Sequence, residues 1–218
     1  MEERDPAFVP KAVEVIEVPL QPPTDGPTFC LAEKTGSGVR PPCAPSQPVA
    51  PGQPARRECE YVRHGTADVR AAFEVQTGTV RAIVRRQHRS AEFIALLRLL
   101  EAEVPRQEVI HLILDPVRLH RSAEGAVYIA LRPWRFRFHW LPRHASWLSF
   151  IEAWFALVSK KCLARSELAE FAAARDTILG FIATYNTQHA HPFTWKKGIR
   201  FYHRLKDMLA SSVPAVAA

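Results

Sequence analysis

The sequence predicts an α/β fold in which a β-sheet is flanked by helices. Residues 109–114 form an almost unbroken apolar run, which is typical of a central strand covered on both faces. Residues 69–84 alternate around a turn, whereas the last third of the chain spaces its apolar residues as helices do. Strands in the first two-thirds followed by helices favour a layered α/β domain, and 218 residues suffice for one large domain or two small ones.

The N-terminal region is expected to be a connecting arm that leads into a buried strand. Residues 1–27 are mixed in character and contain several prolines. The short apolar run at 28–32 predicts a strand. Residues 41–54 hold six prolines, a density that no regular element survives, so we expect an extended loop insertion over 41–58.

The middle of the chain predicts a hairpin, a helix and a central strand. The turn of the hairpin ends at Gly78, where a positive φ is easiest. Ser90 is a suitable N-cap for a helix with Glu92 in its first turn, and Pro105 closes that segment. The buried strand at 109–114 ends at Asp115, and in open α/β sheets catalytic groups collect at this end of the strands.

The C-terminal third is expected to be mostly helical. The predicted elements are a weaker helix at 123–131, a strand at 136–141, a strong helix at 145–163, a helix from Ser166 to about Tyr185, and a basic helix at 198–209. The expected organisation is therefore an arm over 1–27, one domain over 28–210 and a tail over 211–218.

The charge of the chain favours a polyanionic partner. The net charge is +7 and the isoelectric point about 9.5, which fits nucleic acid, although a moderately basic protein without such a partner is the alternative. The four cysteines form no CxxC pair, which argues against structural zinc. No signal peptide or membrane-spanning run is evident, so we expect a cytoplasmic protein with no membrane partner and no small-molecule cofactor.

Asp115 and Glu152 are the residues best placed to carry chemistry. Taken alone, Asp115 could be a helix cap or a loop residue, and Glu152 could form a salt bridge at the edge of an otherwise apolar helix. Trp147 and Trp154 on that helix are most simply core residues. A strand-end aspartate and a helix-borne glutamate could also converge, and carboxylate ligands suit Mg²⁺ or Mn²⁺. Two such ions can catalyse phosphoryl transfer, which generally requires a third carboxylate.

Several motifs, and the order in which they occur, resemble those of the mariner-like group of bacterial DDE transposases. The segment His144 to Phe155 is the most specific, and the resemblance extends over about residues 12–209. The other matching segments are 29–36, 60–66, 88–93, 111–115, 185–186 and 192–195.

The resemblance implies a ribonuclease-H-like mixed sheet flanked by helices, in an enzyme that cuts and joins DNA. It makes Asp115 and Glu152 ligands of Mg²⁺ or Mn²⁺ and DNA the partner, with association to the nucleoid when bound to DNA. Whether the chain forms a homodimer is left undecided by the resemblance. Three departures matter: Ala32 stands where the family has its first aspartate, Pro116 replaces the usual asparagine, and the preceding helix-turn-helix region is not seen.

Ala32 offers no ligand oxygen, so we expect impaired catalysis. Glu33 could replace the missing acid only if a bulge re-aimed it, since side chains alternate along a strand. Asp25, seven residues upstream of Ala32, is a worse substitute.

The basic residues after the proline-rich loop are candidates for contacting DNA phosphates, or else belong to a solvated loop; they are Arg56, Arg57, Arg63 and His64. The alternatives to an impaired nuclease are an inactive DNA-binding or dimerising remnant and a decayed reading frame.

Overall fold

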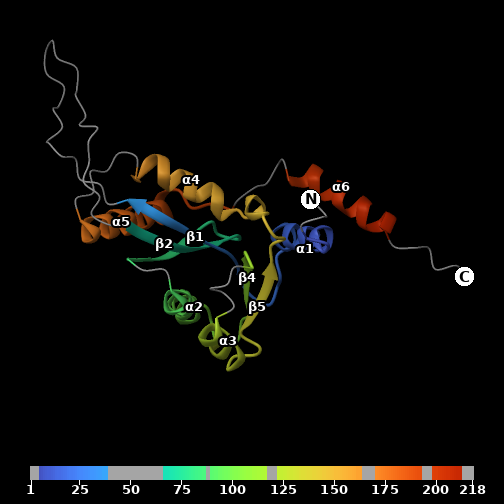
Figure 1. The fold of residues 1–218 in the computed structure, drawn as a ribbon, viewed down its shortest axis with the longest axis horizontal. Coiled ribbons are helices and arrows are strands. Elements are labelled where there is room, and N and C mark those ends of the chain that lie inside the picture. Colours follow the sequence, from blue (N-terminus) through green and yellow to red (C-terminus); the bar gives the residue numbers. More distant parts are fainter. Residues whose placement is uncertain are drawn as a thin grey trace, which may run out of the picture.

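A computed structural model describes residues 5–38, 66–86, 89–116, 122–163, 170–192 and 198–212. Within these ranges one sheet has the strand order β3-β2-β1-β4-β5 (Figure 1). Its strands are β1 (Thr28–Gly38), β2 (Thr66–Glu74), β3 (Val80–Arg85), β4 (Ile110–Leu114) and β5 (Phe136–Trp140). Strand β2 pairs antiparallel with both β1 and β3, whereas β1, β4 and β5 run parallel, so the sheet is mixed as predicted.

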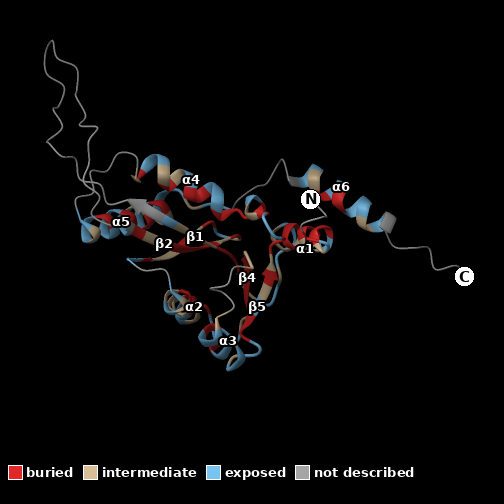
Figure 2. Ribbon diagram, viewed as in Figure 1, coloured by how far each residue is buried: buried red, intermediate tan, exposed pale blue. Residues whose placement is uncertain are grey.

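Helices cover both faces of this sheet. One face carries α2 (Ser90–Glu103) and α3 (Ala123–Ala130), and the other carries α4 (Ile151–Lys161) and α5 (Phe171–Gln188) (Figure 1). Near β5, α1 (Phe8–Leu20) packs side by side with α6 (Gly198–Ser212). Buried residues line the inner sides of these helices and both faces of the sheet, which gives one hydrophobic core on each face (Figure 2).

The two cores divide strictly according to the alternation of side chains along the strands. On β1, Cys30 belongs to the core under α4 and α5, whereas Leu31 belongs to the core under α2. On β4, Ile113 and Leu114 divide in the same way. Leu114 is fully buried and Trp154 on α4 is only 3% exposed, which confirms the deep burial expected for both.

The hairpin is in close contact with α5 and with the segment that follows α5. The side-chain amide of Asn186 accepts a hydrogen bond from the N–H of Val80 and donates one to its carbonyl, both at 2.8 Å. Asn186 therefore continues the hydrogen bonding beyond β3, a terminal strand of the sheet. Gly78 has a φ of 75°, in agreement with the positive φ predicted at this turn. Its Cα lies so close to the backbone of His191 that there is no space for a Cβ.

A chain of hydrogen bonds fixes α1 to the sheet. His111 on β4 and His139 on β5 are both buried, and their Nδ1 and Nε2 atoms lie 3.1 Å apart. The remaining nitrogen of His111 is 2.8 Å from Asp25, and that of His139 is 2.8 Å from Glu14 on α1. Burial lowers the pKa of His111, and the hydrogen bond with His111 lowers the pKa of Asp25. A neutral His111 donating to an ionised Asp25 fits both directions.

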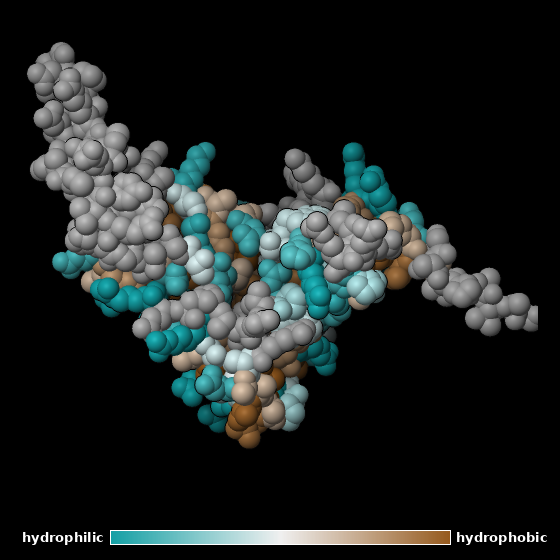
Figure 3. Space-filling model, in the orientation of Figure 1, coloured by the Kyte–Doolittle hydropathy of each residue, from teal (hydrophilic) through white to brown (hydrophobic). Residues whose placement is uncertain are grey.

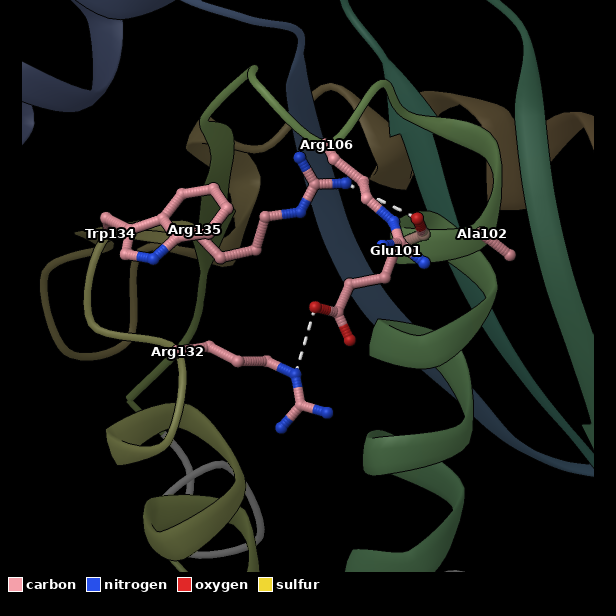
Figure 4. Close-up of a pocket in the computed structure, with 6 residues that line it drawn as sticks. All are labelled: Glu101, Ala102, Arg106, Arg132, Trp134 and Arg135. Atoms are coloured by element: carbon pink, nitrogen blue, oxygen red, sulfur yellow. Dashed lines mark hydrogen bonds and ion pairs between the residues drawn. The ribbon is translucent and has the colours of Figure 1, made fainter.

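A hollow between the end of α2 and the start of β5 is lined by residues that bind one another. Arg135, one of the residues that line this hollow (Figure 4), is buried, and its guanidinium donates to the carbonyls of Val104 and Pro105, each at 2.7 Å. The guanidinium also donates to the carbonyl of Glu101 at 3.4 Å, which is one of the acceptors that the last turn of α2 leaves open. Arg132 pairs with Glu101 at 3.0 Å across the same hollow.

Two large apolar side chains are exposed at α3: Val127 on the helix is 60% exposed, and Leu131 directly after it is 73% exposed. The bottom of the space-filling view, where α3 lies, includes an apolar patch (Figure 3). No helix within the described ranges combines the length and apolarity that crossing a bilayer requires.

Three sequence-based expectations need correction. The region expected to be an arm contains α1, whose inner side is buried in the core. The helix expected at 145–163 is broken: a 3₁₀ turn (η3) at Ser146–Leu148 is separated from α4 by Ser149, which has an extended backbone, and by Phe150. At α2 the N-cap is Arg89, and the Glu92 carboxylate accepts its N–H at 2.9 Å. The proline-rich loop insertion lies outside the described residues.

Candidate active site

The topology of the sheet places Ala32 beside Asp115. Cys30 on β1 is paired with Ile113 on the neighbouring parallel strand β4. Ala32, in the middle of β1, and Asp115, just past the end of β4, each follow two residues later, so they lie on the same face of the sheet. The carboxyl end of strands such as β4 is the edge at which ligand sites form in open α/β sheets.

Helix α4 brings Glu152 to this edge. Ser149 and Phe150, which immediately precede α4, are buried beside Cys30 of β1. Burial raises the pKa of Cys30 to about 12, so the thiol stays neutral and acts as a packing group. Glu152 lies in the first turn of α4, where the helix dipole favours a carboxylate.

Asp115 and Glu152 lie close enough for their charges to interact. Burial raises the pKa of Glu152, and the charge of Asp115 raises it further, while Lys34 opposes both effects. Burial also raises the pKa of Asp115, against the charge of His144. A cation bound near both carboxylates would relieve this unfavourable interaction between like charges.

Glu33 does not supply a third carboxylate. Its Oε1 atom lies 3.0 Å from Nε of Arg70, to which Glu33 is paired across β1 and β2 on the opposite face of the sheet. The irregularity in β1 lies between Lys34 and Ser37, beyond Glu33, so the alternation of side chains is intact there. Across the described part of the chain, no group of three His, Cys, Asp or Glu residues is arranged to hold a metal.

Comparison with protein families agrees with this arrangement. A model described as DDE superfamily endonuclease matches residues 34–173, which is more than half of the chain. This chain belongs to the DDE superfamily of endonucleases. The matched segment contains Asp115 and Glu152 and begins two residues after Ala32.

Solved structures show the fold of this DDE domain in other proteins. The Mos1 strand transfer complex has a TM-score of 0.63 and 13% identity, with 97% of this chain and 62% of that chain covered. The catalytic domain of Mos1 mariner transposase has a TM-score of 0.61 and 11% identity, with 97% and 94% covered. The chain thus spans less than two-thirds of the transposase in the strand transfer complex but nearly all of the separate catalytic domain. A comparison with curated proteins gives no match.

These similarities confirm the ribonuclease-H-like fold that the sequence motifs implied. Placement in a bacterial insertion-sequence group stays a prediction, because none of these comparisons concerns such an element. The roles of Asp115 and Glu152 as metal ligands likewise stay predictions that the geometry supports.

The structure adds three residues to the surroundings of this DDE site. Lys34 and His144 act on Glu152 and Asp115, respectively, through their charges. His144 has a φ of 59°, an uncommon conformation for a residue other than glycine. Trp147, which was expected in the core, is 50% exposed. All three lie within the motifs that carry the resemblance, but their positions depend on how three elements meet. The candidate DNA contacts Arg56, Arg57, Arg63 and His64 lie outside the described residues.

Proposed function

We propose that this chain is the catalytic core of a transposase-type endonuclease in which the loss of one metal-binding carboxylate impairs DNA cleavage. Asp115 and Glu152 are the retained ligands, and Ala32 occupies the position of the lost one. Two observations support the proposal: Ala32 and Asp115 lie on the same face of adjacent strands, and Glu152 on α4 is close enough to interact with the charge of Asp115.

The residues present fit a divalent cation in part. Carboxylate oxygens are the donors that Mg²⁺ and Mn²⁺ prefer, and the mutual repulsion of Asp115 and Glu152 favours a bound cation. Such ions supply Lewis-acid stabilisation of the attacking and leaving oxygens in phosphodiester cleavage. The charge of Lys34 lowers the pKa of Glu152, but burial and the charge of Asp115 still leave that pKa raised, so a further positive charge would stabilise the ionised carboxylate.

Ala32 removes the ligand that would be shared between two ions. Its methyl group packs against the core under α4, and the neighbouring Glu33 is engaged by Arg70 on the other face. Losing charge stabilisation of this kind costs roughly 3–4 kcal/mol of the activation free energy in well-studied sites, or about two to three orders of magnitude in rate.

DNA is the proposed partner. Mos1 structures similar to this chain include a strand transfer complex and a pre-cleavage transpososome, and one Mos1 paired-end complex contains Mn. The net charge of +7 provides the general attraction that binding to a polyanion needs. A second function, an inactive remnant that binds DNA or dimerises, is favoured by the same Ala32 and by the engagement of Glu33.

Nicking of supercoiled plasmid in Mn²⁺ separates these functions. The chain as it stands, Ala32→Asp, and Ala32→Asp combined with Asp115→Ala are compared. The proposal predicts that Ala32→Asp nicks at least 100-fold faster than the parent, in line with the loss given above, and that Asp115→Ala abolishes the gain. Fast nicking by the parent that depends on Asp115 would contradict the impairment. No nicking by any variant would favour the remnant.

A further inference from the structure

A cavity of about 420 Å³ lies between α4 and α5. Most of its wall is formed by large apolar side chains, which are Phe73 of β2, Phe150, Trp154 and Leu157 at α4, and Phe181 of α5. Pockets that bind small organic molecules typically have volumes of roughly 300–1,000 Å³ and apolar, aromatic walls with a few polar groups. The polar groups of this cavity therefore decide what it could bind.

Two nearly buried side chains of the cavity wall carry donors that the protein leaves unpaired. Tyr185 is 8% exposed, and burial raises its pKa, so its hydroxyl stays protonated. That hydroxyl forms no hydrogen bond with any residue in the described ranges. Trp154 meets Tyr185 edge to face with 6.2 Å between ring centroids, and its buried Nε1 also has no partner among the described residues. Buried donors normally have partners, so an acceptor from a bound molecule would complete the bonding of Tyr185.

The charged groups of the cavity are all basic. Lys161 lies in the last turn of α4, and His189 and His191 follow the end of α5. All three are exposed and line the cavity, so they stand at its rim. The described residues that line the cavity include no aspartate or glutamate. The rim therefore attracts an anionic group and repels a cationic one.

The cavity is separate from the carboxylate site. The residues of α4 that line it recur three or four positions apart, from Ala153 to Lys161, and therefore share one side of the helix. Glu152 lies on roughly the opposite side of α4, and neither Glu152 nor Asp115 lines the cavity. A molecule bound here would leave both carboxylates free.

We propose that this cavity binds a small aromatic carboxylate, with its ring among the apolar walls and its carboxylate held by Lys161 and the Tyr185 hydroxyl. Four of the wall residues are aromatic, and aromatic side chains pack favourably against a further ring in offset or edge-to-face contacts. A carboxylate accepts hydrogen bonds from an ammonium group and from a hydroxyl. This site goes beyond the proposed function and depends on neither metal nor DNA.

The test is calorimetric titration of 2-naphthoate into the parent protein without divalent metal or DNA. A ligand with about a dozen non-hydrogen atoms should bind with a Kd of about 1 mM or below. The neutral analogue 2-naphthalenemethanol should bind at least about tenfold more weakly, because it lacks the charged acceptor. Acetate, which has the charge without the ring, should show no binding at the same concentrations.

Four variants locate the binding site on α4. Ala153→Phe fills the cavity from an exposed position and should abolish binding, whereas Ala156→Phe, at an exposed position outside the lining, should preserve it. Lys161→Met should weaken 2-naphthoate binding about two- to fivefold, as the loss of an exposed ion pair does, without affecting the alcohol. Lys160→Met removes the neighbouring exposed lysine, which does not line the cavity, and should have no effect.

Tyr185→Phe tests the buried donor. This substitution removes only the hydroxyl and should weaken 2-naphthoate binding by about tenfold or more, since hydrogen bonds to charged groups are the strong ones. Circular dichroism verifies that each variant keeps its fold.

Several results would overturn the proposal. They are the absence of 2-naphthoate binding at millimolar concentration, equal binding of the acid and the alcohol, and binding that survives Ala153→Phe. If the parent binds no 2-naphthoate and sedimentation shows that Ala153→Phe dissociates a dimer, the occupant of the cavity is a second copy of the chain and the carboxylate site is wrong. Failure of the protein to bind or nick DNA would contradict the proposed function and leave this site intact.

Discussion

The pairing of Glu33 with Arg70 predicts a large loss of stability when Glu33 is neutralised. Arg70 and Glu33 have side chains only 3% and 15% exposed, with 3.0 Å between Nε and Oε1. Burial lowers the pKa of Arg70, whereas Glu33, Glu92 and Asp68 counteract this through their charges. Glu33→Gln therefore leaves a buried guanidinium without its nearest counterion.

Breaking one partner of a buried ion pair costs roughly 3–5 kcal/mol. The lower end, about 3 kcal/mol, applies to Glu33→Gln because Glu92 and Asp68 still act on the guanidinium. For a domain of this size, 1 kcal/mol corresponds to about 2–4 °C, so the melting temperature should fall by about 6–12 °C. Urea and thermal unfolding, followed by circular dichroism, measure both quantities.

Two further variants sharpen this test. Glu103→Gln removes the more exposed partner of the Arg81–Glu103 pair, with a side chain 43% exposed, and should cost less than about 1 kcal/mol. Replacing Glu33 and Arg70 together by Leu and Met should recover most of the loss, because no buried charge remains. A loss below about 1 kcal/mol for Glu33→Gln would refute the ion pair and reopen Glu33 as a metal ligand.

Three more predictions concern the site, the histidine chain and the hairpin. Because the folded pKa of Asp115 is raised, its ionisation opposes folding at neutral pH, so Asp115→Asn should raise the melting temperature at pH 7 and the gain should vanish below about pH 4. Because the folded pKa of His111 is lowered, the unfolding free energy should fall as the pH drops below about 6.5, and His111→Gln should remove that component; an unchanged profile would contradict the role of burial. Gly78→Ala should destabilise by more than about 1 kcal/mol in urea unfolding, since its φ is 75° and a Cβ would lie 1.9 Å from the carbonyl oxygen of His191. Gly180→Ala, in an open helical position of α5, should instead stabilise by about 0.5–1 kcal/mol, and the same sign for both substitutions would contradict this explanation.

Periodicity explains which elements could be predicted from the sequence. Strand β4 is buried at every position, and α2 buries Phe93 and Leu97 on one side, so both elements show a regular pattern of apolar residues in the sequence. Helix α1 was missed because Pro10 and Pro19 argue against a helix. Pro10 lies in the first turn and Pro19 in the last, where proline interferes least.

The site was predictable where it depends on alternation and topology. Asp115 at a strand end and Glu152 on a helix could be assigned to one site, and the alternation along β1 separated Ala32 from Glu33. The exposure of Trp147 could not be predicted, because its spacing from Trp154 suits one continuous helix. The extended backbone of Ser149 breaks that helix and turns the indole away from the core. The charges of Lys34 and His144 reach the carboxylates only through the tertiary fold.

Calorimetric titration of Mn²⁺ into the parent and into Ala32→Asp tests the central claim most directly. Ala32→Asn is the matched control, because it adds nearly the same volume without the charge. We expect Ala32→Asp to bind Mn²⁺ at least tenfold more tightly than both other proteins, a gain of about 1.4 kcal/mol or more. Equal affinities for the three proteins, or tight binding by the parent that Glu33→Gln abolishes, would contradict a site that has lost its ligand at Ala32.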